Sequence, residues 1–122
     1  MAGKATGEFS FKLVATRNSP GPAGSILIEA SWEGTGTGLG AAFVTATYVG
    51  GPKAGTYSTC GAAYLDNGDA LTTIGQGTYE STGKHHWRTQ SFVQISDGRR
   101  ISSEGEIDLA SRSWKRKLSE IS

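Results

Sequence analysis

The stretch KHHWRTQSFVQISDGRRISSEGEIDL, residues 84–109, contains two segments of alternating polar and apolar residues with a turn between them. Neighbouring side chains of a β-strand point to opposite faces, so this alternation predicts strands at 84–95 and 100–109. The intervening Ser96-Asp97-Gly98 is typical of a β-hairpin connection. The stretch therefore predicts an antiparallel pair of strands with one apolar face and one charged face.

The turn decides how the two strands pair. A two-residue Asp97-Gly98 turn would place Trp87 opposite Asp108. A three-residue loop, with Gly98 in the left-handed region and a bulge, places Trp87 opposite Ile107 instead. Because a slip of one residue moves every side chain to the other face, only the second register pairs apolar with apolar residues throughout. We therefore predict the three-residue loop.

This register predicts an ordered charged face, here called the charged ladder. Pairing Leu109 with Arg112 in the next hairpin adds a third strand to it. The three rows of the charged ladder are His86–Asp108–Ser113, Arg88–Glu106–Lys115 and Gln90–Glu104–Lys117. The opposite face of the same strands is apolar and consists of Trp87, Ile101, Ile107, Trp114 and Leu118.

The charged ladder has two interpretations. On the outside of the protein it is a solvated face, in which opposite charges across the sheet contribute roughly 0.2–1 kcal/mol each. Facing a lumen or a subunit interface, His86 and Asp108 would form an acid–base pair, with Arg88 available to hold an anion. We favour the outside, because a buried unpaired charge is costly. The candidate catalytic residues are His86, Arg88, Glu106 and Asp108, and none of them is assigned a role.

The same alternation extends over the whole chain. No segment has a convincing helical period, and we expect only a short 3₁₀ turn near the prolines. An all-β, eight-stranded, antiparallel up-and-down β-barrel is the predicted fold, with a two-sheet β-sandwich as the alternative. Closure of the barrel removes the exposed edges of the sheet. The eight predicted strands are 7–17, 24–34, 39–49, 54–65, 69–80, 84–95, 100–109 and 112–121.

Length, charge and cysteine content limit the class of protein. The chain of 122 residues predicts one domain over residues 1–122. Lys and Arg number 12 and Asp and Glu 11, and the basic RSWKRKL follows the acidic SSEGEIDL, so we expect no nucleic-acid partner. The single Cys60 fits a reducing compartment. Without a long apolar run or signal peptide, we expect a cytoplasmic protein that does not bind membranes.

The alternation also predicts which side chains are buried. Cys60 is expected to be a small core residue and not a nucleophile, because no activating base lies near it. The four tyrosines, Tyr48, Tyr57, Tyr64 and Tyr79, either supply phenols to a lumen or are ordinary strand residues. The predicted core is Phe9, Phe11, Ile26, Ile28, Trp87, Ile101, Ile107, Trp114 and Leu118.

No metal site or cofactor site is predicted. His85 and His86 are neighbours on one strand, so they point to opposite faces and cannot share a metal ion. The motif Gly36-x-Gly38-x-x-Ala41 matches a dinucleotide fingerprint in letters only, because a strand follows it where the fingerprint needs a helix.

Four segments resemble a known group of proteins. They are ATGEFSFK at 5–12, EASWEGTGTGLG at 29–40, GTYESTG at 77–83 and SSEGEIDLASRSWKRKL at 102–118. Together they resemble small bacterial proteins of uncharacterised function that share the fold of allene oxide cyclase. The resemblance implies an eight-stranded barrel and homo-oligomers. Allene oxide cyclase binds an apolar fatty-acid epoxide in its lumen, but none of its catalytic residues can be placed on this chain.

These observations lead to three hypotheses for function. The first is a protein that binds a small apolar ligand in the barrel lumen, since eight-stranded barrels have room for one small ligand. The second is a cyclase or isomerase, in which lumenal polar groups stabilise a developing charge. The third is a non-catalytic homo-oligomeric assembly module whose lumen is filled by side chains.

Overall fold

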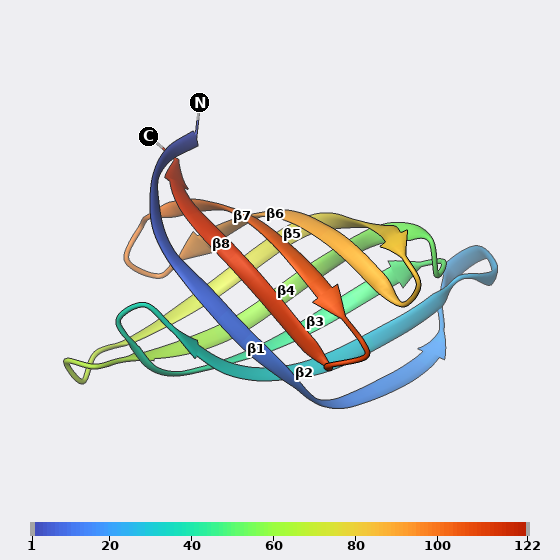
Figure 1. Cartoon of the computed structure of the whole chain (residues 1–122), viewed down its shortest axis with the longest axis horizontal. Coiled ribbons are helices and arrows are strands. Elements are labelled where there is room, and N and C mark those ends of the chain that lie inside the picture. The colour runs from blue at the N-terminus through green and yellow to red at the C-terminus, as the bar shows by residue number, and fades with distance from the viewer. Residues whose placement is uncertain (1, 122) are drawn as a thin grey trace.

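The eight strands form one closed antiparallel barrel in chain order (Figure 1). The computed structural model describes the backbone of residues 2–121 and the side chains of residues 7–38 and 40–121. β8 pairs with β1 and closes the barrel, so the predicted up-and-down barrel is confirmed over the β-sandwich. The strands are β1 (Ala2–Pro20), β2 (Ile26–Gly36), β3 (Leu39–Gly50), β4 (Ala54–Leu65), β5 (Ala70–Gly83), β6 (His86–Ile95), β7 (Arg100–Asp108) and β8 (Ser113–Ile121). A 3₁₀ turn, η1 (Pro22–Gly24), connects β1 to β2.

The register predicted for β6 and β7 is confirmed. Trp87 pairs with Ile107, Arg88 with Glu106 and His86 with Asp108. Gly98 has a φ of +97° and donates its N–H to the carbonyl of Ile95 at 2.9 Å. A left-handed residue at this position is what sets the bulge and hence the register.

The predicted pairing of β7 with β8 is also confirmed. Ile107 lies opposite Trp114, and Glu106 lies opposite Lys115. The Arg112 N–H bonds the Leu109 carbonyl at 3.3 Å in the turn between the strands. The apolar faces of β6, β7 and β8 thus line one side of the barrel interior.

Trp114 fills the middle of the barrel. Its side chain is fully buried, and its ring lies 5.3 Å from Trp32 and 5.7 Å from Tyr57, centroid to centroid. The indole N–H donates to Thr89 Oγ1 at 3.1 Å. A Cβ at position 105 would lie 2.9 Å from this nitrogen, so Gly105 leaves the room in which the indole lies. Rings from four further strands, β1 to β4, pack around Trp114 and form this central aromatic layer; they are those of Phe11, Trp32, Tyr48 and Tyr57.

Most residues of the predicted core are buried or pack against buried residues, but the prediction that Ile26 is buried is wrong. Its side chain is 54% exposed. Ile26 is the first residue of β2 and pairs with Pro20 and Gly50 at the barrel's end. Its position there lies beyond the central aromatic layer, which explains the exposure.

The expectation of a buried Cys60 is corrected, and the structure shows the faces on which Ala15 and Tyr64 lie. A bulge in β1 between Leu13 and Ala15 reverses the alternation, so Ala15 is exposed although it is an even number of residues from the inward-facing Phe9 and Phe11. Cys60 is exposed, because the inward positions of β4 are those of its buried neighbours Tyr57 and Thr59. Tyr64 shares the parity of Cys60 and is 49% exposed, so its phenol does not reach the lumen.

No helix within residues 2–121 is long and apolar enough to cross a membrane.

We predict that Trp114→Ala lowers the free energy of unfolding by about 3–5 kcal/mol, as truncation of a large buried side chain does. Lys115→Ala, one residue away on the exposed face, is the matched control and should change it by no more than about 0.5 kcal/mol. Urea denaturation measures both. A loss below about 1 kcal/mol for Trp114→Ala would contradict the central packing role.

Candidate functional site

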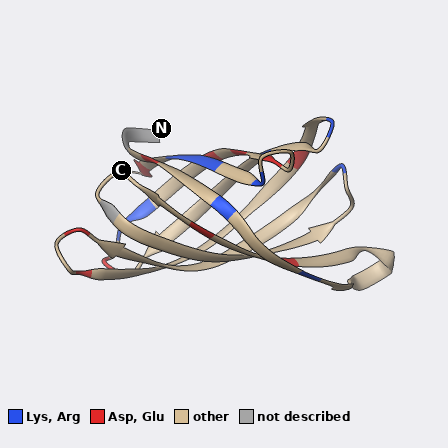
Figure 2. Ribbon diagram, turned by 60° about the horizontal axis from the view of Figure 1, so that its bottom comes forward, with Lys and Arg blue, Asp and Glu red and all other residues tan. Residues whose placement is uncertain are grey.

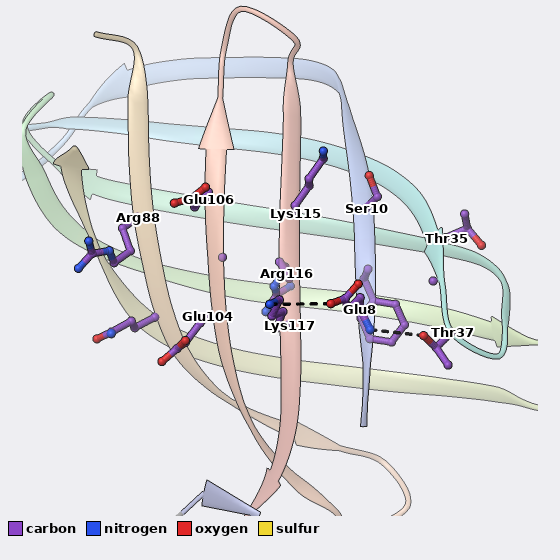
Figure 3. Close-up of a pocket in the computed structure, with 14 residues that line it drawn as sticks. Glu8, Ser10, Thr35, Thr37, Arg88, Glu104, Glu106, Lys115, Arg116 and Lys117 are labelled. Carbon is purple, nitrogen blue, oxygen red and sulfur yellow. Dashed lines mark hydrogen bonds and ion pairs between the residues drawn. The ribbon is translucent and has the colours of Figure 1, made fainter. Parts of the chain in front are cut away.

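The candidate residues from the sequence lie on the outside of the barrel. Arg88 and Glu106 are exposed, while His86 and Asp108 are half-buried at the ends of β6 and β7. Figure 3 shows Arg88, Glu106 and Lys115 on neighbouring strands. Two of the three rows of the charged ladder line a hollow of about 1030 Å³ on the outer face, which extends to Glu8 on β1. These rows are Arg88–Glu106–Lys115 and Gln90–Glu104–Lys117.

Within the charged ladder, the side chains bond to different partners from those predicted. Arg88 forms its ion pair with Glu80 of β5 at 3.6 Å, and both side chains are more than half exposed. His86 Nδ1 lies 3.2 Å from Thr82 Oγ1. The carboxylate of Asp108 accepts the Ala110 N–H at 2.9 Å. His86 and Asp108 are therefore register neighbours that bond to other partners, His86 to the end of β5 and Asp108 to the β7–β8 turn.

The barrel interior contains a first cavity, here called the Tyr48 cavity, of about 260 Å³. It lies on one side of the central aromatic layer, at the end of the barrel that carries the β3–β4 loop. Its lining is predominantly apolar. The large side chains in this lining include Leu13, Ile28, Trp32, Tyr48, Trp87 and Ile107.

Two hydrogen bonds hold the β3–β4 loop over this end of the barrel. Tyr79 donates its hydroxyl to the carbonyl of Gly51 at 2.9 Å. Trp87 donates its indole N–H to the carbonyl of Pro52 at 2.8 Å. Because all four residues line the Tyr48 cavity, these bonds fix the shape of its rim.

Among the described residues, three buried donors near the centre of the barrel have no hydrogen-bond partner. They are the Trp32 indole N–H and the hydroxyls of Tyr48 and Tyr57. Burial raises the pKa of Tyr48 far above its ordinary value, and the neighbouring Tyr57 phenol acts in the same direction. The Trp32 N–H opposes this rise, although it does not reach hydrogen-bonding geometry with the Tyr48 oxygen. Tyr48 is therefore a neutral phenol that can donate.

A second cavity, here called the Arg116 cavity, occupies about 160 Å³ at the opposite end of the barrel. Arg116 lines it and is only 7% exposed. Burial lowers the pKa of this guanidinium, which nevertheless stays protonated at physiological pH. Sequence reasoning missed Arg116, although its position two residues after the inward-facing Trp114 gives it the same parity.

The described part of the chain contains no group of three His, Cys, Asp or Glu side chains arranged to hold a metal ion. Compared with protein-family models, curated proteins and solved structures, the chain has no match. The eight-stranded closed barrel implied by the resemblance is confirmed, and no family follows from the comparisons.

We predict that Glu106→Gln changes the free energy of unfolding by no more than about 1 kcal/mol and leaves lumenal ligand binding unchanged, because exposed ion pairs contribute little. Chemical denaturation and a binding titration measure the two effects. Loss of binding in this variant would place the charged ladder in a functional site.

Proposed function

We propose that the protein binds a small, mainly apolar molecule with an acceptor oxygen in the Tyr48 cavity. The observation that carries this proposal is the set of unpartnered donors, Trp32 Nε1 and the Tyr48 hydroxyl, beside an apolar cavity. A buried donor without a partner costs roughly 1–3 kcal/mol. Both side chains line the cavity, and although their donor atoms are covered in the ligand-free structure, a small side-chain rotation would let a carbonyl, ether or epoxide oxygen of the ligand act as the missing acceptor. The apolar wall would bind the remainder of the ligand.

The donors select the chemistry of the ligand. An indole N–H can only donate, and the Tyr48 phenol stays protonated because burial raises its pKa. A ligand that only donates hydrogen bonds could bond to the Tyr48 oxygen, but it would leave the Tyr48 O–H and the Trp32 N–H without an acceptor. The volume of about 260 Å³ suits one small molecule and not a long chain.

A lumenal cyclase or isomerase is the second candidate. Donors such as Trp32 Nε1 and the Tyr48 hydroxyl would stabilise a developing oxyanion if both were directed at it. However, the described residues that line the Tyr48 cavity include no His, Asp, Glu or Lys that could act as a general base. A reaction in this cavity would therefore depend on hydrogen bonding to the substrate and on the shape of the cavity alone. Ligand binding is therefore the function that we favour.

We predict that Tyr48→Phe has opposite effects on stability and on binding. Removing the unpartnered hydroxyl should raise the free energy of unfolding of the ligand-free protein by roughly 1 kcal/mol. It should also weaken the binding of acetophenone, a ketone probe, about tenfold, which corresponds to about 1.4 kcal/mol. Calorimetric titration and chemical denaturation measure the two effects.

Two controls separate hydrogen bonding from packing. Ethylbenzene matches acetophenone in shape without the oxygen, so its weaker binding should not change in Tyr48→Phe. Tyr64→Phe removes a phenol from the outer face and should alter neither measurement. Unchanged acetophenone affinity in Tyr48→Phe would contradict the proposal.

We also retain the homo-oligomer as a proposal. β3 and β4 contain no charged residue, and Figure 2 shows long uncharged stretches of the barrel wall. Their outer surface, with that of β5 and β6, exposes large apolar side chains. These are Phe43 (49%), Tyr64 (49%), Ile74 (62%) and Phe92 (70%).

We predict that native mass spectrometry detects a homo-oligomer that Phe92→Glu dissociates, because a charge placed in an apolar interface is costly. Lys12→Glu, on the exposed charged side of β1, is the control and should leave the assembly intact. A wild-type monomer would contradict the homo-oligomer.

A further inference from the structure

Arg116 is a buried cation whose described neighbours are neutral. Its Nε donates to Ser103 Oγ at 3.0 Å, and its Nη2 donates to Ser91 Oγ at 3.5 Å. The guanidinium lies 4.5 Å from the Trp114 ring centroid and 6.0 Å from that of Phe11. None of the ion pairs formed within the described residues involves Arg116.

These contacts compensate the buried charge only in part. Two serine hydroxyls use two of the five N–H donors of a guanidinium. The ring contacts favour a cation, but they do not replace a counter-charge in a low-dielectric interior. A buried charge is normally paired, so the geometry around Arg116 leaves the place of an anion open.

The Arg116 cavity provides that place. Its wall is formed largely by aliphatic and aromatic side chains, such as Phe11, Val44, Val93 and Ile101. No Asp or Glu is among the described residues that line it. The exposed side chain of Arg99 lies at its mouth, where it is already paired with Asp97 at 2.9 Å. A solvent-accessible apolar cavity with one unpaired cation remains.

We infer that the Arg116 cavity is a second binding site, which takes a small apolar carboxylate. The carboxylate would pair with the guanidinium, whose planar fork matches two carboxylate oxygens. The apolar part of the ligand would contact the aliphatic wall. The cavity of about 160 Å³ limits this part to a short chain or a single ring. The site is separate from the Tyr48 cavity and does not depend on the function proposed there.

Benzoate and its neutral isostere benzamide test this inference by calorimetric titration. The wild-type protein should bind benzoate at least tenfold more tightly than benzamide. In Arg116→Met this preference should disappear, while benzamide affinity should change less than threefold. Lys115→Met removes the same charge from the exposed side of β8 and should retain the full preference.

An NMR measurement on the wild-type protein covers the case in which Arg116→Met does not fold. Benzoate should shift the Arg116 Nε–H resonance, and benzamide should not. Equal affinity for the two probes, no benzoate binding at millimolar concentration, or a preference that persists in Arg116→Met would each overturn the inference. Tyr48→Phe should leave the preference unchanged, so failure of this site and failure of the Tyr48 cavity are distinguishable.

Discussion

The contact between the Trp114 indole and the backbone of Gly105 determines how the interior is organised. With no Cβ at position 105, the indole lies against β7 and reaches Thr89 on β6. It also meets the rings of Trp32 and Tyr57 from the opposite wall. This aromatic layer separates the lumen into two cavities of different chemistry, one beside neutral donors and one beside a cation.

Several buried donor groups among the described residues of the interior lack an acceptor or a counter-charge. Trp32, Tyr48 and Tyr57 have buried donor groups without partners, and the hydrogen bonds of the Arg116 side chain go to neutral hydroxyls. A lumen selected for stability alone would replace these groups with apolar side chains, because unpaired polar groups oppose folding. Retaining them has a physical rationale if acceptor oxygens of ligands complete their hydrogen bonds. Ligand binding in the lumen thus gives the same explanation for the unpartnered donors near the Tyr48 cavity and for Arg116 in the second cavity.

The sequence predicts the barrel well because its strands alternate clearly and the Gly98 turn allows one consistent register. It predicts the charged ladder for the same reason. It does not predict that Arg116 is buried, because an arginine within the basic segment RSWKRKL is expected in solvent. Only its position two residues after Trp114, on the same face of the strand, indicates burial. The exposure of Cys60 depends on which face of β4 turns inward. Because β4 contains no charged residue, the sequence does not show which of its two faces is in solvent.

A high-resolution crystal structure of the purified protein tests the central claim most directly, because it shows what occupies the lumen. We expect two separate cavities and, in the Tyr48 cavity, density for a bound molecule with an oxygen within hydrogen-bonding distance of the Tyr48 hydroxyl. A lumen closed by side chains, with the Trp32 and Tyr48 donors satisfied by protein acceptors, would contradict it.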